Sequence, residues 1–278
     1  MGLLKKGPLP FYQKKKVRMK KEIFLWTTIF SGLVVMTFIL LPLIHMVASP
    51  SWENLKAAFG DRDVIKSIWL SIYTAGLAAI ISFIVGTPFA YLLARKAFWG
   101  KRFVESIVDL PIVIPHPVVG IALLGVAGKN HWIGQILYEL GIRIMGSVTG
   151  IVTVLTFVGM PFYINTVKDG FESISPRLEN VSRSLGASMF STFFRITFPL
   201  AWRSMVVGMI MCCARAISEF GAVVIIAYHP MIAPVLIYER FEAYGLKYSQ
   251  PVAVLLILIC LALFLFLRIL SMPGKKEV

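Results

Sequence analysis

Two residues of opposite charge lie inside an apolar stretch of the chain. Arg215 and Glu219 interrupt the run from Ser204 to about Tyr228 and are four residues apart. A charge near the centre of a bilayer costs about 3 kcal/mol on insertion scales, so such residues are usually paired or functional. On a helix this spacing puts both side chains on one face, where they can pair. Two interpretations stay open: a pair that locks a helix bundle, or a positive site on the path of an anion that Glu219 keeps from binding too tightly.

A histidine in another apolar run could also meet an anion. His116 lies between Pro115 and Pro117, with Pro111 nearby. Proline removes helix hydrogen bonds, so a kink is predicted here. His116 could donate a hydrogen bond to an anion, or it could be a structural residue satisfied by its neighbours.

The sequence lacks the motifs that carry covalent chemistry. It contains no G-x4-G-K-[ST] phosphate loop, no H-E-x-x-H zinc motif and no G-x-S-x-G nucleophile motif. Cys212, Cys213 and Cys260 do not have metal-ligand spacing. We therefore expect no enzyme activity, no cofactor and no metal site. Energy for any work must come from a partner or from an ion gradient.

The composition is that of an integral membrane protein. Of 278 residues, 58% are hydrophobic and 15% are charged, with a mean hydropathy of +0.79. An average soluble protein has about 25% charged residues. An all-α fold with six transmembrane helices is predicted, because long apolar runs without alternation favour helices over a barrel. The predicted spans are 23–47, 67–94, 110–128, 144–167, 204–228 and 248–267.

Positive charge predicts how the spans are oriented. The segments on one side of the predicted spans carry 20 Lys and Arg residues, and those on the other side carry seven. The positive-inside rule then puts both termini in the cytoplasm of a multi-pass protein of the cell membrane. The basic tail 1–22 is interpreted as an anchor for lipid headgroups, and 271–278 as a C-terminal tail. This distribution explains most of the net charge of +14 and gives no reason to expect nucleic-acid binding.

The predicted loop between the fourth and fifth spans contains a short helix. Ser175 and Pro176 are a typical helix start, a capping hydroxyl followed by proline, and Gly186 is a typical stop. An apolar stripe is predicted on this helix from the spacing of Leu178, Val181, Ser182 and Leu185. A second amphipathic run, from Met189 to Ile196, is expected to end at Pro199. The stripe could lie on lipid headgroups or dock on a cytoplasmic partner.

The same loop resembles the signature loop of ABC-importer permeases, which has the pattern E-A-A-x3-G-x9-I-x-L-P. The matching positions, with one acidic residue just before the triplet, are Glu179, Asn180, Val181, Ser182, Gly186, Ile196 and Pro199. The Gly, Ile, Pro and spacing agree, whereas the E-A-A triplet differs. The resemblance implies that this loop is a coupling helix that inserts into a cleft of an ATPase subunit. We call residues 172–199 the signature loop.

Other stretches resemble the molybdate, tungstate and sulfate permeases of this family. They are Leu110–Gly120, Ile217–Ala222, Tyr228–Pro230 and Ala233–Phe241, the last most similar to the archaeal tungstate/molybdate branch. The resemblance covers roughly 67–270, which it identifies as a type I ABC transmembrane domain preceded by a separate first helix.

The family implies a particular assembly. Two copies of the chain would form the pore, two ATP-binding cassette ATPase subunits would sit beneath them, and an extracytoplasmic substrate-binding protein would deliver tungstate or molybdate. Sulfate or thiosulfate is the alternative cargo. An ion-coupled secondary transporter is the alternative mechanism.

Overall fold

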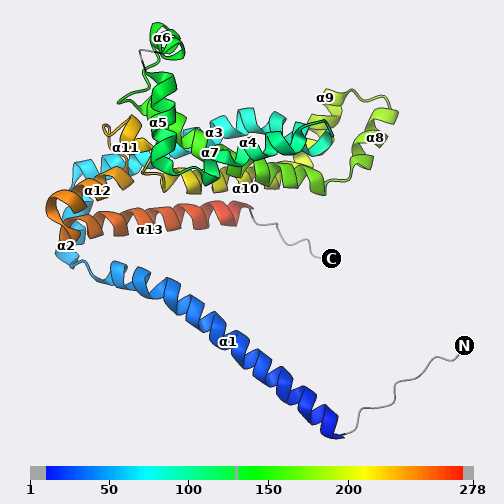
Figure 1. Cartoon of the computed structure of the whole chain (residues 1–278), viewed down its shortest axis with the longest axis horizontal. Helices are drawn as coiled ribbons and strands as arrows, with labels where there is room; N and C mark the ends of the chain where they lie inside the picture. Colours follow the sequence, from blue (N-terminus) through cyan, green and yellow to red (C-terminus); the bar gives the residue numbers. More distant parts are fainter. Residues whose placement is uncertain (1–10, 129–130, 272–278) are drawn as a thin grey trace, which may run out of the picture. The chain divides into compact units, whose positions relative to one another are not determined.

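The computed structural model describes residues 11–128 and 131–271, with side chains for 22–128 and 131–265. Residues 1–10 of the predicted basic tail and residues 272–278 of the C-terminal tail lie outside this range. The described residues form helices and their connections, and Figure 1 shows them. The helices are α1 (Phe11–Ala48), α2 (Trp52–Gly60), α3 (Arg62–Arg95), α4 (Lys101–Val113), α5 (His116–Ala127), α6 (Trp132–Glu139), α7 (Val148–Ser173), α8 (Pro176–Ser184), α9 (Met189–Thr192), the π-helical η1 (Phe193–Thr197), α10 (Phe198–Ile217), α11 (Val223–Ile226), α12 (Ala233–Tyr244) and α13 (Leu246–Ser271).

The chain divides into two compact units at Pro50. The first contains α1, which begins at Phe11 and therefore includes the second half of the segment predicted as a tail. Its apolar part, Glu22–Ala48, is long enough to cross a bilayer. The second unit, from Ser51 onward, holds all the candidate site residues.

The centre of the second unit is a bundle of α3, α7 and α10 (Figure 1). Tyr163 on α7 is completely buried there, and its hydroxyl lies 2.6 Å from Oγ1 of Thr87 on α3. Gly86 leaves room for this ring, because a Cβ at that position would lie 2.8 Å from it. The close approach of the two backbones and the hydrogen bond between the two hydroxyls therefore fix α7 against α3 in an apolar setting.

Within the part of the chain that the structure describes, five helices are long and apolar enough to cross a membrane. They are Glu22–Ala48, Arg62–Arg95, Val148–Ser173, Met189–Ile217 and Leu246–Leu265. A sixth candidate is the pair α4 and α5, which bends by 111°. The prediction of a single third span over 110–128 is wrong in this respect: the segment starts at Lys101 and breaks after Val113. The proline cluster around His116 explains the break, as predicted.

The predicted fifth span, 204–228, also needs correction. Its helix is part of a longer segment that starts at Met189 and ends at Ile217. Residues 218–222 then form a non-helical turn before the short α11. In the second unit the signature loop lies at one end of the bundle, and α2 and α12 lie at the other (Figure 1).

Candidate functional site

The helix of the signature loop has the ends that its sequence predicts, with one difference. Pro176 is in the first turn of α8, and Ser175 occupies the capping position, but its hydroxyl makes no capping hydrogen bond. Gly186 ends the helix with a φ of +90°, where a side chain would be strained. The N–H groups of Gly186 and Ala187 donate to the carbonyls of Arg183 (3.0 Å) and Ser182 (3.2 Å), which closes the last turn.

The apolar stripe of α8 faces away from the bundle. Leu178, Val181 and Leu185 are 47%, 59% and 83% exposed. Ser182, also in the predicted stripe, is half-buried, and its hydroxyl lies 3.1 Å from that of Thr192 on α9. The loop is thus braced internally while three large apolar side chains remain uncovered by this chain.

Glu179 is held on the opposite side of α8, where it is only 9% exposed. Nε and Nη2 of Arg95 both lie 2.8 Å from Oε1 of this carboxylate. The hydroxyls of Tyr91 and Thr197 donate to it at 3.0 Å each. Since Tyr91 and Arg95 belong to α3 and Thr197 to η1, one carboxylate connects α8 to the two helices that border it. Charge-assisted bonds of this kind are the stronger ones in proteins.

The helix that follows Gly186 does not end where predicted. Pro199 does not end a helix; it lies in the first turn of α10, which continues from α9 through η1. Ile196 is half-buried within η1, and Asn180 is exposed. Asn180 lines a cavity of about 380 Å³ between α8 and the Arg95 end of α3. A π-helical segment of this kind often marks a functional site.

The three charged or polar residues proposed for the membrane interior come together in space. Nη2 of Arg215 lies 2.7 Å from Oε2 of Glu219 and 2.7 Å from Nε2 of His116. Nδ1 of His116 lies 3.3 Å from the same Glu219 oxygen. Residues 99 apart in sequence thus form one group, which we call the charged cluster: His116, Arg215 and Glu219.

The positions of these residues differ from a simple helical pair. Arg215 is in the last turn of α10, but Glu219 lies in the turn after the helix end, so it is not on the same helix face as predicted. Its Oε1 accepts a hydrogen bond from the N–H of Ala222 at 2.9 Å. This turn packs closely on the start of α5, since a Cβ on Gly120 would lie 2.9 Å from the Ala222 carbonyl.

The cluster balances its own charge. Glu219 is only 1% exposed, whereas the side chains of Arg215 and His116 are 18% and 40% exposed. Arginine can only donate, so the ring nitrogen that it meets must accept. Nη2 of Arg215 also lies 2.9 Å from Nδ1 of His116, so both ring nitrogens face the same guanidinium nitrogen. The cluster presents a reachable guanidinium backed by a buried carboxylate.

Sequence reasoning missed the partners of Glu179. Arg95 contributes to the positive charge that predicts the orientation of the spans, but no sequence pattern singles out Arg95, Tyr91 or Thr197 as partners of Glu179. The available signal is the acidic Glu179, which is next to the stripe in sequence but points to another side of the helix. A carboxylate that becomes buried there needs a hydrogen-bond donor. Two of the donors to Glu179, Arg95 and Tyr91, are 84 and 88 positions away in α3, and Thr197 is 18 positions away in η1, so no local pattern contains them.

Comparisons with known proteins agree with this architecture. Residues 86–272 match the family model described as "Binding-protein-dependent transport system inner membrane component". The chain is 44% identical to the molybdate/tungstate transport system permease protein WtpB of Pyrococcus furiosus over 88% of its own length and 94% of the relative's. It is 30% identical to the probable sulfate transport system permease protein cysT of Zygnema circumcarinatum, over 92% and 90%.

Solved structures share the fold at lower sequence identity. A chain of a bacterial ABC transporter involved in the import of the acidic polysaccharide alginate matches with a TM-score of 0.72 at 17% identity, over 93% of this chain and 98% of that one. A chain of the MetNI methionine ABC transporter matches with a TM-score of 0.61 at 16% identity, over 75% and 94%. The fold is therefore that of type I importer permeases, as predicted. The chain belongs to the family of binding-protein-dependent transport system inner membrane components, which confirms the predicted multi-pass membrane permease and places it among transport proteins rather than enzymes.

Proposed function

We propose that this chain is the permease subunit of an ATP-driven importer that carries tungstate or molybdate across the cell membrane. Support for the cargo comes from relatives such as WtpB, with identities of 41–44% over most of the chain. The sulfate permeases are more distant, at 29–31%. Sulfate or thiosulfate is thus the second candidate within the same mechanism.

The observation that carries the mechanism is the exposed apolar stripe of α8. Leu178, Val181 and Leu185 stand on a helix whose other side is fastened by Glu179. A stripe of this size is suited to a hydrophobic cleft on a partner, and the fastened side can transmit a push from that partner into α3 and α10. We assign the partner as the ATPase subunit, with Glu179 as a positioning residue and Asn180, Val181, Ser182 and Gly186 in the docking surface.

The charged cluster fits a place on the anion path. The guanidinium of Arg215 can attract a divalent oxyanion, and Glu219 and His116 compete with that anion for the same Nη2. Competition keeps binding weak enough for release, which transport requires. The alternative is a purely structural lock between α5 and α10, and the two differ in what Arg215→Gln does to uptake in a folded protein.

The proposed assembly follows the family. Two copies of this chain form the pore, with their termini in the cytoplasm, and bind two ATPase subunits and one substrate-binding protein. One matching solved structure is described as an alginate transporter in complex with a ligand-bound periplasmic protein, which supports the last of these partner kinds.

The test is uptake by proteoliposomes. The permease is reconstituted with its ATPase, and tungstate is offered with the substrate-binding protein on one side and ATP on the other. We expect tungstate uptake only when ATP, ATPase and binding protein are all present. Uptake that continues without the ATPase and follows a proton or sodium gradient would instead identify a secondary transporter, and uptake of sulfate in preference to tungstate would change the cargo.

A further inference from the structure

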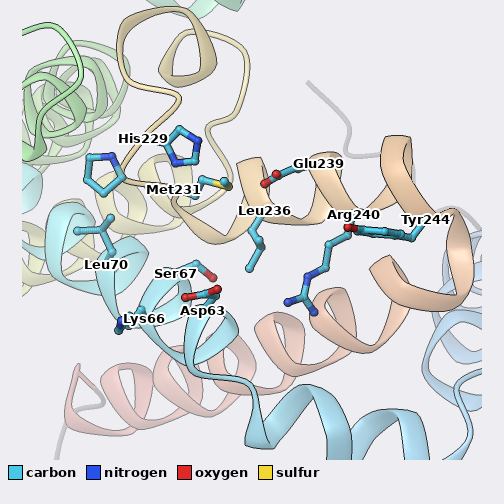
Figure 2. A pocket seen from close by; sticks show the side chains of 11 residues that line it. Asp63, Lys66, Ser67, Leu70, His229, Met231, Leu236, Glu239, Arg240 and Tyr244 are labelled. Carbon is cyan, nitrogen blue, oxygen red and sulfur yellow. The ribbon is translucent and has the colours of Figure 1, made fainter.

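A cleft with charged walls lies at the Arg62 end of α3, opposite the end that holds the signature loop. It has a volume of about 490 Å³ and is lined by the start of α3, by residues 229–231 and by α12. Figure 2 shows its polar side chains, Asp63, Lys66, His229, Glu239 and Arg240, around this space. We call it the α3–α12 cleft. Since α3 has 34 residues, about 50 Å separates this cleft from the signature loop.

The walls of the cleft are fixed by contacts within the chain. The carboxylate of Asp61 caps α3 by accepting from the N–H of Asp63 at 2.8 Å. Its second oxygen accepts from Nη2 of Arg240 at 2.6 Å, which ties α12 to the start of α3. Ser71 on α3 accepts from the N–H of Ala233 at 2.8 Å, which ties the first turn of α12 to the same helix. A ligand would therefore meet a cleft that is already formed, which lowers the entropic cost of binding.

Glu239 is the side chain in this cleft that lacks a partner. Its Oε2 is buried and has no hydrogen-bond partner among the described residues. The neighbouring Arg240 does not supply one and instead donates from Nη2 to Asp61. Figure 2 shows the Glu239 carboxylate on the α12 side of the cleft, directed towards Met231 and His229. A buried carboxylate oxygen without a donor is costly, so a donor from outside the chain would be favoured here.

The charges of the cleft select the kind of ligand. A divalent oxyanion would be repelled by both Glu239 and Asp63. Arg240 is already paired with Asp61, which leaves Lys66 at the rim as the unpaired cation among the described lining residues, so the cargo fits this place poorly. Within the described residues, no group of three or more His, Cys, Asp or Glu side chains could hold a metal ion. A guanidinium or ammonium group can donate to Glu239 with a complementary charge, and the exposed Lys66 and Asp63 at the rim can pair with further charges beside it.

We infer that the α3–α12 cleft receives a lysine or arginine side chain of the substrate-binding protein, with Glu239 as its acceptor. The inference rests on the proposed function, because it needs an external partner on the side of the membrane away from the ATPase. The cleft is also linked to the charged cluster: Tyr238, next to Glu239, packs on Phe220 with ring centroids 4.9 Å apart, and Phe220 directly follows Glu219. The packed rings of Tyr238 and Phe220 thus connect Glu239 to Glu219, the residue that holds Arg215.

Glu239→Gln tests this inference, with Glu242→Gln as the matched control. Both variants remove one negative charge from α12, but Glu242 is exposed and does not line the cleft. The readout is the concentration of tungstate-loaded binding protein that gives half-maximal stimulation of ATP hydrolysis by the reconstituted complex. We expect Glu239→Gln to raise this concentration about tenfold or more, with unchanged hydrolysis in the absence of binding protein. Glu242→Gln should change it less than about twofold.

A second measurement does not depend on the charge change. Lys66→Cys at the exposed rim of the cleft should react with a membrane-impermeant maleimide, and docking of the loaded binding protein should slow that reaction. Equal half-maximal concentrations for Glu239→Gln and the parent complex, or no protection of the cysteine, would overturn the inference. If the parent complex itself is not stimulated by a binding protein, the proposed function fails instead, so the two failures can be told apart.

Discussion

Nη2 of Arg215 and Oε2 of Glu219 are 2.7 Å apart, but only the arginine can be reached from outside the pair. An anion that enters can meet the guanidinium while the carboxylate stays buried behind it. This asymmetry is what a site on a path needs. A structural lock needs only that both groups be paired, so burial of both would serve it equally well.

We expect Arg215→Gln to lower ATP-dependent tungstate uptake about tenfold or more, because the positive charge on the path is lost. Arg203→Gln is the control, since Arg203 is on the same helix and exposed. Uptake and thermal unfolding of the purified complex are measured together. A structural lock predicts lower thermal stability with proportionate loss of uptake. Unchanged uptake by a folded Arg215→Gln protein would remove Arg215 from the path.

We expect Glu179→Gln to uncouple hydrolysis from transport. The neutral side chain can accept from Arg95 but no longer attracts its charge, so the strongest connection of α8 to α3 is weakened, at a cost of about 1.5–3 kcal/mol in stability. The ratio of tungstate transported to ATP hydrolysed should fall, while ATPase binding should be retained. Glu172→Gln is the control, because Glu172 is 46% exposed and its ion pair with Nζ of Lys101 is long, at 3.9 Å. A normal ratio in Glu179→Gln would contradict the positioning role.

Leu185→Glu should abolish docking of the ATPase. Leu185 is 83% exposed at the end of the apolar stripe, and a charge there would have to be desolvated in a hydrophobic cleft. Ser184→Glu places the same charge on the preceding residue, outside the predicted stripe, and should have a much smaller effect on docking of the ATPase. Co-purification of ATPase with the permease is the measurement. If Leu185→Glu retains the ATPase, the stripe contacts something else, such as lipid headgroups.

Gly120→Ala and Gly125→Ala should differ although both lie in α5. A Cβ at Gly120 would be 2.9 Å from a backbone carbonyl of the turn that carries Glu219, whereas a Cβ at Gly125 meets nothing within 4 Å. We expect Gly120→Ala to lower the free energy of unfolding by about 1–3 kcal/mol and to lower tungstate uptake, because the turn that carries Glu219 must move. Gly125→Ala should be neutral or slightly stabilising. Thermal unfolding of the two variants decides the matter, and similar losses in both would mean that the contact at Gly120 is not rigid.

The Asp61–Arg240 pair should make stability depend on acid pH. Burial alone would raise the pKa of Asp61, but the hydrogen bond from Arg240, together with the backbone N–H bonds, outweighs it and lowers the pKa below its ordinary value. A lowered folded-state pKa means that the stabilisation is present above the unfolded value and is lost as the pH falls through the folded value.

The measurement for this pair compares the parent protein with Asp61→Asn. Thermal unfolding is followed from about pH 6 to about pH 3, the range that spans an ordinary aspartate pKa of about 3.9. We expect the parent to be more stable at the upper end and the difference to shrink towards the lower end. A difference that stays constant over the whole range would show that the ionised form of Asp61 contributes nothing.

The local features of the signature loop were predictable because they depend on neighbours in sequence. Pro176 and Gly186 mark the ends of α8, and the spacing of Leu178, Val181 and Leu185 sets its apolar stripe. The end of the following run at Pro199 was predicted wrongly. A proline in the first turn of a helix is compatible with its continuation, since the N–H that it lacks is not needed there.

The charged cluster was predictable in its members but not in its geometry. Arg215, Glu219 and His116 stood out because polar groups are rare in apolar runs. Their convergence depends on the bend after Val113 and on the end of α10 at Ile217. A hydropathy profile shows neither of them, because the apolar sequence continues through both places. The same holds for Glu239, whose unpartnered oxygen appears only when α12 is placed against α3.

How the pair α4 and α5, with its bend of 111°, crosses the membrane also decides whether the number of membrane crossings is odd or even. With the pair counted as one crossing the described residues make six, which puts the start of α1 and the end of α13 on the same face of the membrane. If the pair enters and leaves by one face there are five crossings, and the ends lie on opposite faces. Two reporter fusions, one at each terminus, therefore read out the path of residues 101–127, although neither reporter is close to them.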